Sequence, residues 1–120
     1  MANRFVDSPV VEHADCFCAM SQEAYARFNG LVAGTLIYDP DRVSLDRDGA
    51  RRHLAIRASA IAEGDLGNSL LANVVFLGAA TRVLEERLDP ENVLAALAER
   101  ITRFQEQNQR AFEAGWNRAR

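Results

Sequence analysis

The stretch DCFCAMSQEAYARFNGLVAGTLIYD, residues 15–39, has the order strand, helix, strand, and this order decides the fold class. Residues 15–20 form a short apolar run, which is typical of a buried strand. A second run, residues 35–38, is followed by Asp39-Pro40, which stops a strand. Two strands joined through a helix in about 25 residues make a minimal parallel βαβ unit. The sequence therefore predicts an α/β fold built on a parallel sheet.

The segment between these strands has the start and end signals of a helix. Ser21 is a good N-cap, and apolar residues follow at helical spacing at Ala24, Tyr25 and Phe28. Asn29-Gly30 then predicts the end of the helix, because both residues tolerate the left-handed conformation.

Downstream of the second strand the pattern becomes mainly helical. Residues 51–58 are consistent with a third strand, residues 59–68 with a short helix or turn, and residues 69–86 with a helix. Asp89-Pro90 starts a further helix, with Asp89 as the N-cap and Pro90 at the first helical position. Its apolar stripe contains Val93, Leu94, Leu97, Ile101, Phe104, Ala111 and Phe112, and Gly115 is expected to end it.

The whole chain, residues 1–120, reads as a single domain. We expect a partial Rossmann-like parallel sheet of two to four strands with a helical C-terminal half. The opening residues, up to Asp15, contain a Ser-Pro break and few periodic apolar residues, so a loop or short extended segment is expected there.

Composition excludes several classes of function. The net charge of −3 gives no electrostatic reason to expect nucleic acid or an anionic membrane surface as a partner. All 14 basic residues are arginine, so this chain supplies neither a Schiff-base lysine nor a P-loop lysine. The start lacks the pattern of a signal peptide, and the longest apolar run is shorter than the roughly 20 residues that span a bilayer. We expect a cytoplasmic protein without a membrane partner.

Cys16 and Cys18 admit two interpretations. They could form a metal or redox pair, but two thiolates alone cannot complete a four-ligand zinc or iron–sulfur site, and His13 and His53 are not at ligand spacing. The alternative is a buried strand on which residues i and i+2 share one face. We favour the buried strand and expect no metal site, and free buried cysteines agree with a reducing compartment.

The stretch GNSLLANVVFLGAA, residues 67–80, is apolar on nearly every side of a helix, with Asn73 set inside it. A helix that is apolar all round is expected to have neighbours on every side. Gly78 would let another backbone approach closely. A buried amide without a partner costs about 1–3 kcal/mol, so we expect the Asn73 side chain to tie the helix to a neighbouring backbone or loop, with ligand contact as the alternative.

Asp39 and Asp41 lie just after the second strand, where α/β sheets place their ligands. Two carboxylates there could bind a metal or act as acid and base. The simpler interpretation, which we favour, is a solvated loop rich in aspartate and arginine.

Three segments of the chain together resemble the gamma subunit, or gamma domain, of the 2-oxoacid:acceptor oxidoreductases. Residues 7–43 have the family's acidic Ala-Asp before a strand, then a helix and a Gly-Thr strand that ends at Asp. Residues 60–80, AIAEGDLGNSLLANVVFLGAA, are similar to the family's A-x-x-x-G-N-x-x-x-x-N-x-x-x-L-G-A, which is the most specific of the three. Residues 108–116, NQRAFEAGW, are similar to its terminal N-x-x-A-F-x-x-G-aromatic.

This resemblance implies a non-catalytic subunit of a large enzyme, such as a pyruvate, 2-oxoglutarate, 2-oxoisovalerate (ketoisovalerate) or indolepyruvate ferredoxin oxidoreductase. These enzymes oxidatively decarboxylate a 2-oxoacid to an acyl-CoA. Thiamine diphosphate, Mg²⁺ and iron–sulfur clusters would lie on the catalytic alpha and beta subunits, so this chain would hold none of them and no catalytic residue. Its role in the hetero-oligomer would be to pack against those subunits and help close over coenzyme A.

The resemblance also assigns candidate residues. Gly67 and Asn68 precede a helix, where free N–H groups suit an anion, so they could contact a coenzyme A phosphate or a partner carboxylate; a turn with Asn68 as N-cap is the simpler alternative. The expected interface residues are Asn73, Phe76, Leu77, Gly78, Asn108 and Trp116. For Asn108, Gly115 and Trp116, packing onto the domain or a partner is favoured over substrate binding.

One departure from the family leaves alternatives open. The family's domain normally opens with a strand, a glycine-rich turn and a helix before the Asp-Ser-Pro element, and these are missing here, as is the G-x-G-x-x-G fingerprint. The missing part could reflect a fragment, a shortened subunit or a half carried by another chain. The rival functions are a free-standing α/β module that binds a small ligand and a pure assembly protein.

Overall fold

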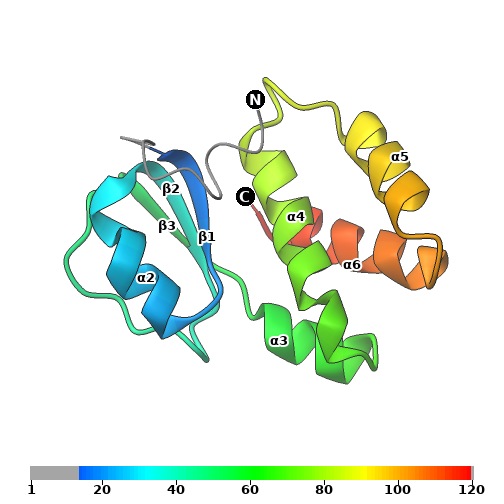
Figure 1. Ribbon diagram of the computed structural model, residues 1–120, viewed down its shortest axis with the longest axis horizontal. Helices are drawn as coiled ribbons and strands as arrows, with labels where there is room; N and C mark the ends of the chain where they lie inside the picture. The colour runs from blue at the N-terminus through cyan, green and yellow to red at the C-terminus, as the bar shows by residue number, and fades with distance from the viewer. Residues whose placement is uncertain (1–13, 120) are drawn as a thin grey trace.

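The computed structural model describes residues 14–119, so the expectations for the opening segment lie outside the described residues, apart from its last two positions. Figure 1 shows a small sheet with one helix on its outer side, joined to a group of helices. The elements are β1 (Ala14–Ala19), α2 (Gln22–Phe28), β2 (Val32–Tyr38), β3 (Arg52–Ala55), α3 (Ala58–Ala60), α4 (Ala72–Val83), α5 (Pro90–Arg100) and α6 (Gln105–Arg118). A π-helical turn (Ile61–Asp65) follows α3, and a 3-10 turn (Ser69–Leu71) leads into α4.

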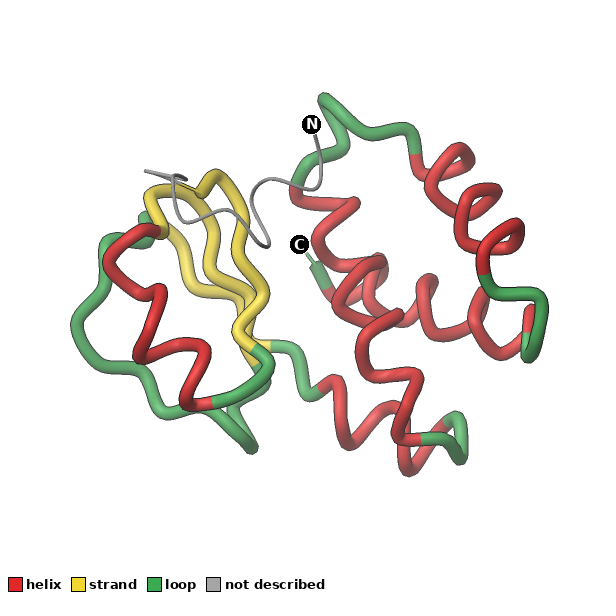
Figure 2. Tube along the Cα trace, in the orientation of Figure 1, coloured by secondary structure: helices red, strands yellow, loops and turns green. Residues whose placement is uncertain are grey.

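The sheet has the order β1-β2-β3, and both pairs of neighbours are parallel (Figure 2). One row across the sheet is Cys18, Ile37 and Leu54. The predicted parallel sheet of two to four strands is therefore confirmed, including the third strand, which is shorter than residues 51–58. The N-cap at Ser21 is also confirmed, because its side chain accepts a hydrogen bond from Ala24 N at 3.1 Å.

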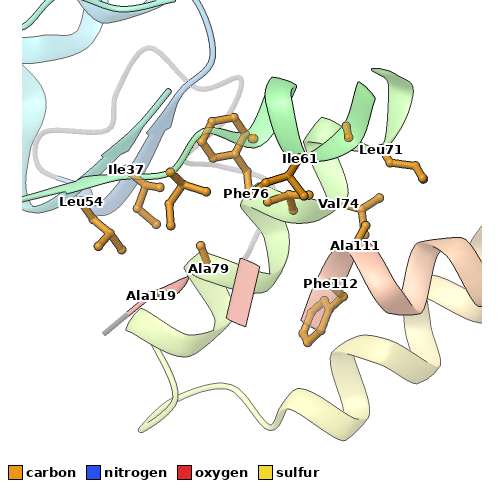
Figure 3. Close-up of a cluster of buried hydrophobic side chains, with 14 residues drawn as sticks. Ile37, Leu54, Ile61, Leu71, Val74, Phe76, Ala79, Ala111, Phe112 and Ala119 are labelled. Atoms are coloured by element: carbon orange, nitrogen blue, oxygen red, sulfur yellow. The ribbon is translucent and has the colours of Figure 1, made fainter. Parts of the chain in front are cut away.

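The two faces of the sheet bury different side chains. Leu36 belongs to a small cluster with Tyr25 of α2, whereas its neighbour Ile37 belongs to the larger cluster with the helices of the other side (Figure 3). Cys16 and Cys18 also pack against the larger cluster, which confirms that they share one face of β1. Both faces of the parallel sheet are thus covered, as such sheets require.

The crossing of α4 and α6 forms the centre of the helical half. A Cβ atom on Gly78 would lie 1.9 Å from the carbonyl oxygen of Phe112, and one on Gly115 would lie 1.8 Å from that of Val75. The expectation that Gly78 admits another backbone is confirmed, and that backbone is α6 of the same chain. The expectation that Gly115 ends a helix is wrong, because Gly115 lies inside α6 at the contact with α4.

The long helix expected from Pro90 onward is wrong in one respect, because it is divided into α5 and α6. Ile101 is extended (φ −117°, ψ 98°), and Phe104 adopts the left-handed conformation (φ 58°, ψ 37°), so the chain turns between them. The turn lets α6 lie against α4, whereas α5 stands at the outer side of the helical half and contains no fully buried residue (Figure 1).

Two helix ends differ from expectation in part. Helix α2 ends at Phe28 with Asn29 as its C-cap, so the end predicted at Asn29-Gly30 is confirmed, but Asn29 is right-handed (φ −58°) and the chain continues through a 3-10 turn, Asn29–Leu31. Helix α4 stops at Val83 rather than near residue 86. The residues beyond it include Glu85 and Glu86, both exposed, and two carboxylates at a helix C-terminus oppose the helix dipole.

Candidate functional site

The carboxyl ends of the strands carry two aspartates with different environments. Asp39 follows β2 and is fully buried; its carboxylate accepts hydrogen bonds from the backbone N–H groups of Asp41 at 2.9 Å and Ser59 at 3.0 Å. Asp41 is partly exposed and forms a bidentate pair with Arg57, at 2.9 and 3.1 Å. The hydrogen bonds and charge of Asp41 raise the pKa of Arg57.

These contacts decide between the two interpretations of the aspartates. Asp39 is not part of a solvated loop, because it joins the end of β2 to the start of α3 from a buried position. Neither does the geometry favour a metal or an acid–base pair, since Asp39 bonds backbone N–H groups and Asp41 bonds Arg57. Among residues 14–119, no group of three or more His, Cys, Asp or Glu side chains is placed to hold a metal ion.

A shallow hollow lies beside this edge of the sheet, between the end of β3 and the π-helical turn. It is lined by Ala55, Ile56, Arg57, Ala60, Ile61, Asp65 and Arg118. Gly67 follows the π-helical turn, and its φ of +70° is a left-handed value that favours glycine.

Asn68 follows Gly67 and caps the helical segment that leads into α4. Its side-chain oxygen accepts a hydrogen bond from Leu70 N at 3.0 Å, and its own N–H donates to the carbonyl of Ala62 at 2.8 Å. The N-cap interpretation is therefore confirmed. The segment begins as a 3-10 turn at Ser69, so the expected helix start is confirmed with a different first turn.

Helix α4 has an inner and an outer face, which corrects the expectation of burial on every side. Val74, Val75, Phe76, Gly78, Ala79 and Thr81 are buried. Asn73 is exposed, and its side chain has no hydrogen-bond partner among the described residues, so the predicted tie to a backbone or loop is wrong within this chain. On the same outer face, Leu77 is 36% exposed and Leu70, in the 3-10 turn, is 79% exposed.

The other residues assigned to an interface make contacts inside the chain. Phe76 belongs to the buried cluster (Figure 3). Gly78 lies against the backbone of α6. Asn108 is buried and donates from Nδ2 to the carbonyl of Arg103 at 3.0 Å, which holds the turn between α5 and α6. Trp116 is half-buried, with the Arg82 guanidinium 4.9 Å from its ring centre. Their role toward a partner stays a prediction.

The sequence did not predict a polar network around the buried Tyr25, which extends to the exposed His53. The Tyr25 hydroxyl donates to Asp48 Oδ2 at 2.7 Å and accepts from Asp46 N at 2.8 Å, while His53 Nε2 lies 2.9 Å from Asp48 Oδ1. Burial favours a raised pKa for Asp48, but hydrogen bonds from Tyr25, His53 and the Ala50 N–H outweigh it and lower that pKa. No local motif indicates this network, because its members come from α2, from the loop between β2 and β3, and from β3.

The thiols on β1 also influence each other. A hydrogen bond with Cys18 lowers the pKa of Cys16, whereas the same bond, together with burial, raises the pKa of Cys18. Both thiols are free and half-buried.

Residues 2–118 match the family described as pyruvate ferredoxin/flavodoxin oxidoreductase. The chain belongs to this family. Within residues 14–119, no helix is long and apolar enough to cross a membrane.

The chain is also similar to individual proteins of this kind. The chain is 30% identical over 117 residues to the 2-oxoglutarate synthase subunit KorC of Archaeoglobus fulgidus, covering 96% of this chain and 58% of that protein. A crystal structure of a keto/oxoacid ferredoxin oxidoreductase gamma subunit from Geobacter sulfurreducens matches with a TM-score of 0.78 and 28% identity, over 88% of this chain and 64% of that one. This chain thus spans less than two thirds of the length of each.

A further solved structure shares the fold. The 2-oxoglutarate:ferredoxin oxidoreductase of Magnetococcus marinus, with 2-oxoglutarate, coenzyme A and succinyl-CoA bound, matches with a TM-score of 0.59 and 24% identity. The match covers 88% of this chain and 19% of that chain.

Proposed function

We propose that this chain is part of the gamma subunit of a 2-oxoacid:acceptor oxidoreductase and contributes packing surface to the enzyme. The observation that carries this proposal is the outer face of α4 and its leading turn, where Leu70, Asn73 and Leu77 are exposed at helical spacing. The inner face of the same helix packs against the sheet and α6. Burial of two leucines against another subunit would remove apolar surface from water and stabilise the complex.

In this proposal the chemistry lies on partner subunits. Those subunits would hold thiamine diphosphate, Mg²⁺ and iron–sulfur clusters, oxidise the 2-oxoacid to an acyl-CoA and pass electrons to ferredoxin. The family match over residues 2–118 and the gamma-subunit relative support this assignment. The engagement of Asp39 and Asp41 in contacts within the chain agrees with it.

The interface is tested by Leu77→Asp with Leu45→Asp as a matched control. Leu45 is 39% exposed, similar to Leu77, but lies in the loop between β2 and β3. The tagged variants would be purified from the native host, and their subunit composition and stability measured. We expect Leu77→Asp to lose the large subunits while folding normally and Leu45→Asp to retain them. An intact complex with Leu77→Asp would overturn the proposed interface.

The same purification tests the function itself. Wild-type chain that carries large subunits with thiamine diphosphate and iron–sulfur clusters would support the proposal. Wild-type chain that emerges alone as a stable monomer would overturn it, and the free-standing binding module would then be the better explanation.

We propose further that Gly67 and Asn68 contact coenzyme A through its phosphates. Asn68→Asp separates this role from capping, because aspartate keeps the cap acceptor but places a negative charge at the site. We expect Asn68→Asp in the assembled enzyme to bind coenzyme A at least about tenfold more weakly at unchanged stability, whereas Asn68→Ala should also lose about 0.5–2 kcal/mol of stability. Unchanged coenzyme A affinity in both variants would leave Asn68 as a cap alone.

A further inference from the structure

Helix α5 and the first turn of α6 form a groove that the proposed function does not use. The groove has a volume of about 620 Å³, and its apolar lining comes from Leu94, Ala95, Leu97 and Ala98 of α5. The two leucines are only half-buried, and the two alanines are exposed. The chain therefore leaves an apolar helix face partly open to solvent.

The polar lining of the groove carries negative charge. The amide side chains of Gln105, Asn108 and Gln109 each donate a hydrogen bond within the chain. The carboxylates of Glu91 and Glu106 also line the groove, but they have no ion-pair or hydrogen-bond partner among residues 14–119. Within this described part of the chain, no basic side chain lines the groove. Two unpaired carboxylates thus flank an apolar surface.

The turn that joins α5 to α6 lies at one end of this groove and exposes two further apolar side chains (Figure 1). Ile101 is 41% exposed and Phe104 is 52% exposed. Phe104 is also left-handed (φ 58°), a strained conformation for phenylalanine, and such strain clusters at binding sites. Because aromatic side chains are enriched at protein interfaces, this end of the groove suits contact with another protein.

The shape and the charge of the groove select the kind of partner. Both walls are helices, so the groove offers side chains rather than the free backbone groups with which an extended strand pairs. An amphipathic helix can place apolar side chains in such a groove, and lysine or arginine at its edges would complement Glu91 and Glu106. We propose that the groove between α5 and α6 binds a basic amphipathic helix of a partner protein.

The first test titrates the full chain with two fluorescent peptides, one of leucine and lysine at helical spacing and one of leucine and glutamate at the same spacing. We expect the lysine peptide to bind, and to bind more weakly as the salt concentration rises. The glutamate peptide should bind at least about tenfold more weakly than the lysine peptide.

Two neighbouring alanines provide a matched pair of variants. Ala95→Arg places a long cationic side chain in the groove and should weaken the lysine peptide at least about tenfold. Ala96 is equally an exposed alanine of α5 but does not line the groove, so Ala96→Arg should leave the affinity within about twofold. Circular dichroism checks that both variants fold.

A second measurement identifies the natural occupant. The photo-cross-linking residue p-benzoylphenylalanine is incorporated in place of Ala95 in the native host, with the same residue in place of Ala96 as the control. Mass spectrometry then gives the sequence of the segment that is cross-linked. From position 95 we expect a segment rich in lysine and arginine, with apolar residues at i, i+3 or i+4, and i+7.

Four results would overturn the proposed site. The two peptides could bind equally well, Ala95→Arg could bind the lysine peptide as well as Ala96→Arg does, position 95 could cross-link to an acidic segment or a second copy of this chain, or it could cross-link to nothing. The titration needs no other subunit, and Leu70 and Leu77 do not line the groove. Failure of this site is therefore distinguishable from failure of the proposed oxidoreductase function.

Discussion

Gly78 of α4 and Gly115 of α6 form a reciprocal contact, in which each glycine lies against a backbone carbonyl of the other helix. The carbonyls belong to Phe112 and Val75, so the two backbones touch at two points without side chains between them. The crossing positions the outer face of α4 by fixing its inner face.

Replacing Gly78 with alanine should therefore destabilise the protein. The new methyl group would meet the Phe112 carbonyl at 1.9 Å, which forces the helices apart and should cost about 3 kcal/mol. Gly64→Ala is the matched control, because no atom lies within 4 Å of a Cβ there. Thermal unfolding should show a clear loss for the first and little change for the second; equal midpoints would contradict the contact.

The Tyr25 hydroxyl should contribute more to the free energy of unfolding than an ordinary tyrosine hydroxyl does. Tyr25→Phe removes a donor to buried Asp48 and an acceptor for Asp46 N, so it should cost about 1–3 kcal/mol. Tyr38→Phe removes a hydroxyl without a hydrogen-bond partner among the described residues and should be nearly neutral. Denaturant unfolding measures both, and a smaller loss for Tyr25→Phe than for Tyr38→Phe would reject the network.

The same network predicts a dependence of stability on pH. The folded-state pKa of Asp48 lies below its ordinary value of 3.8, so its contribution is present above that value and is lost as the pH falls through the folded pKa. The pKa of Tyr25 is raised from 10.0, chiefly by burial, so its contribution is present below pH 10 and is lost as the pH rises through the folded value.

Asp48→Asn tests the loss of stability that is expected at acid pH. The variant should be less stable than wild type at neutral pH, and the difference should shrink as the pH falls below about 4. Free energies of unfolding at several pH values check this. A difference that stays constant into the acid range would show that the Asp48 charge contributes nothing.

The two aspartates at the sheet edge should respond differently to removal of their charge. Asp39→Asn places an amide N–H₂ against a backbone N–H inside the protein, and we expect a loss of about 2 kcal/mol. Asp41→Asn weakens an ion pair whose side chains are 66% and 41% exposed, which should change stability by less than about 1 kcal/mol. Similar losses in both variants, measured by chemical unfolding, would disprove the difference in role.

The strand-helix-strand unit could be predicted because its signals are local. The cap at Ser21 and the run of buried residues in β2 follow from a few neighbouring residues. The division between α5 and α6 could not be predicted, because the apolar spacing on both sides is compatible with one helix. The residue that turns the chain, Phe104, is left-handed although phenylalanine rarely adopts that conformation.

The site shows the same limit. The motif residues Asn108, Ala111, Phe112 and Gly115 share a buried face, as their spacing suggests. The spacing does not reveal which backbone they meet, and it does not reveal that Asn73 is exposed while its neighbours Val74 and Val75 are buried. From its residue types, α4 was expected to be apolar on every side. Tertiary packing instead gives α4 one buried face and one exposed face.

The contact of α4 and α6 at Gly78 and Gly115 has a consequence for biosynthesis. On the ribosome, the sheet residues and α2 emerge first and can associate through contacts close in sequence, since domains and subdomains fold as they are made. The space beside Gly78 stays open until α6 has been translated, because the backbone of Phe112 in α6 fills it in the folded chain. The nascent chain therefore carries an uncovered helix through much of its synthesis, and this interval is the one in which a chaperone would be most useful.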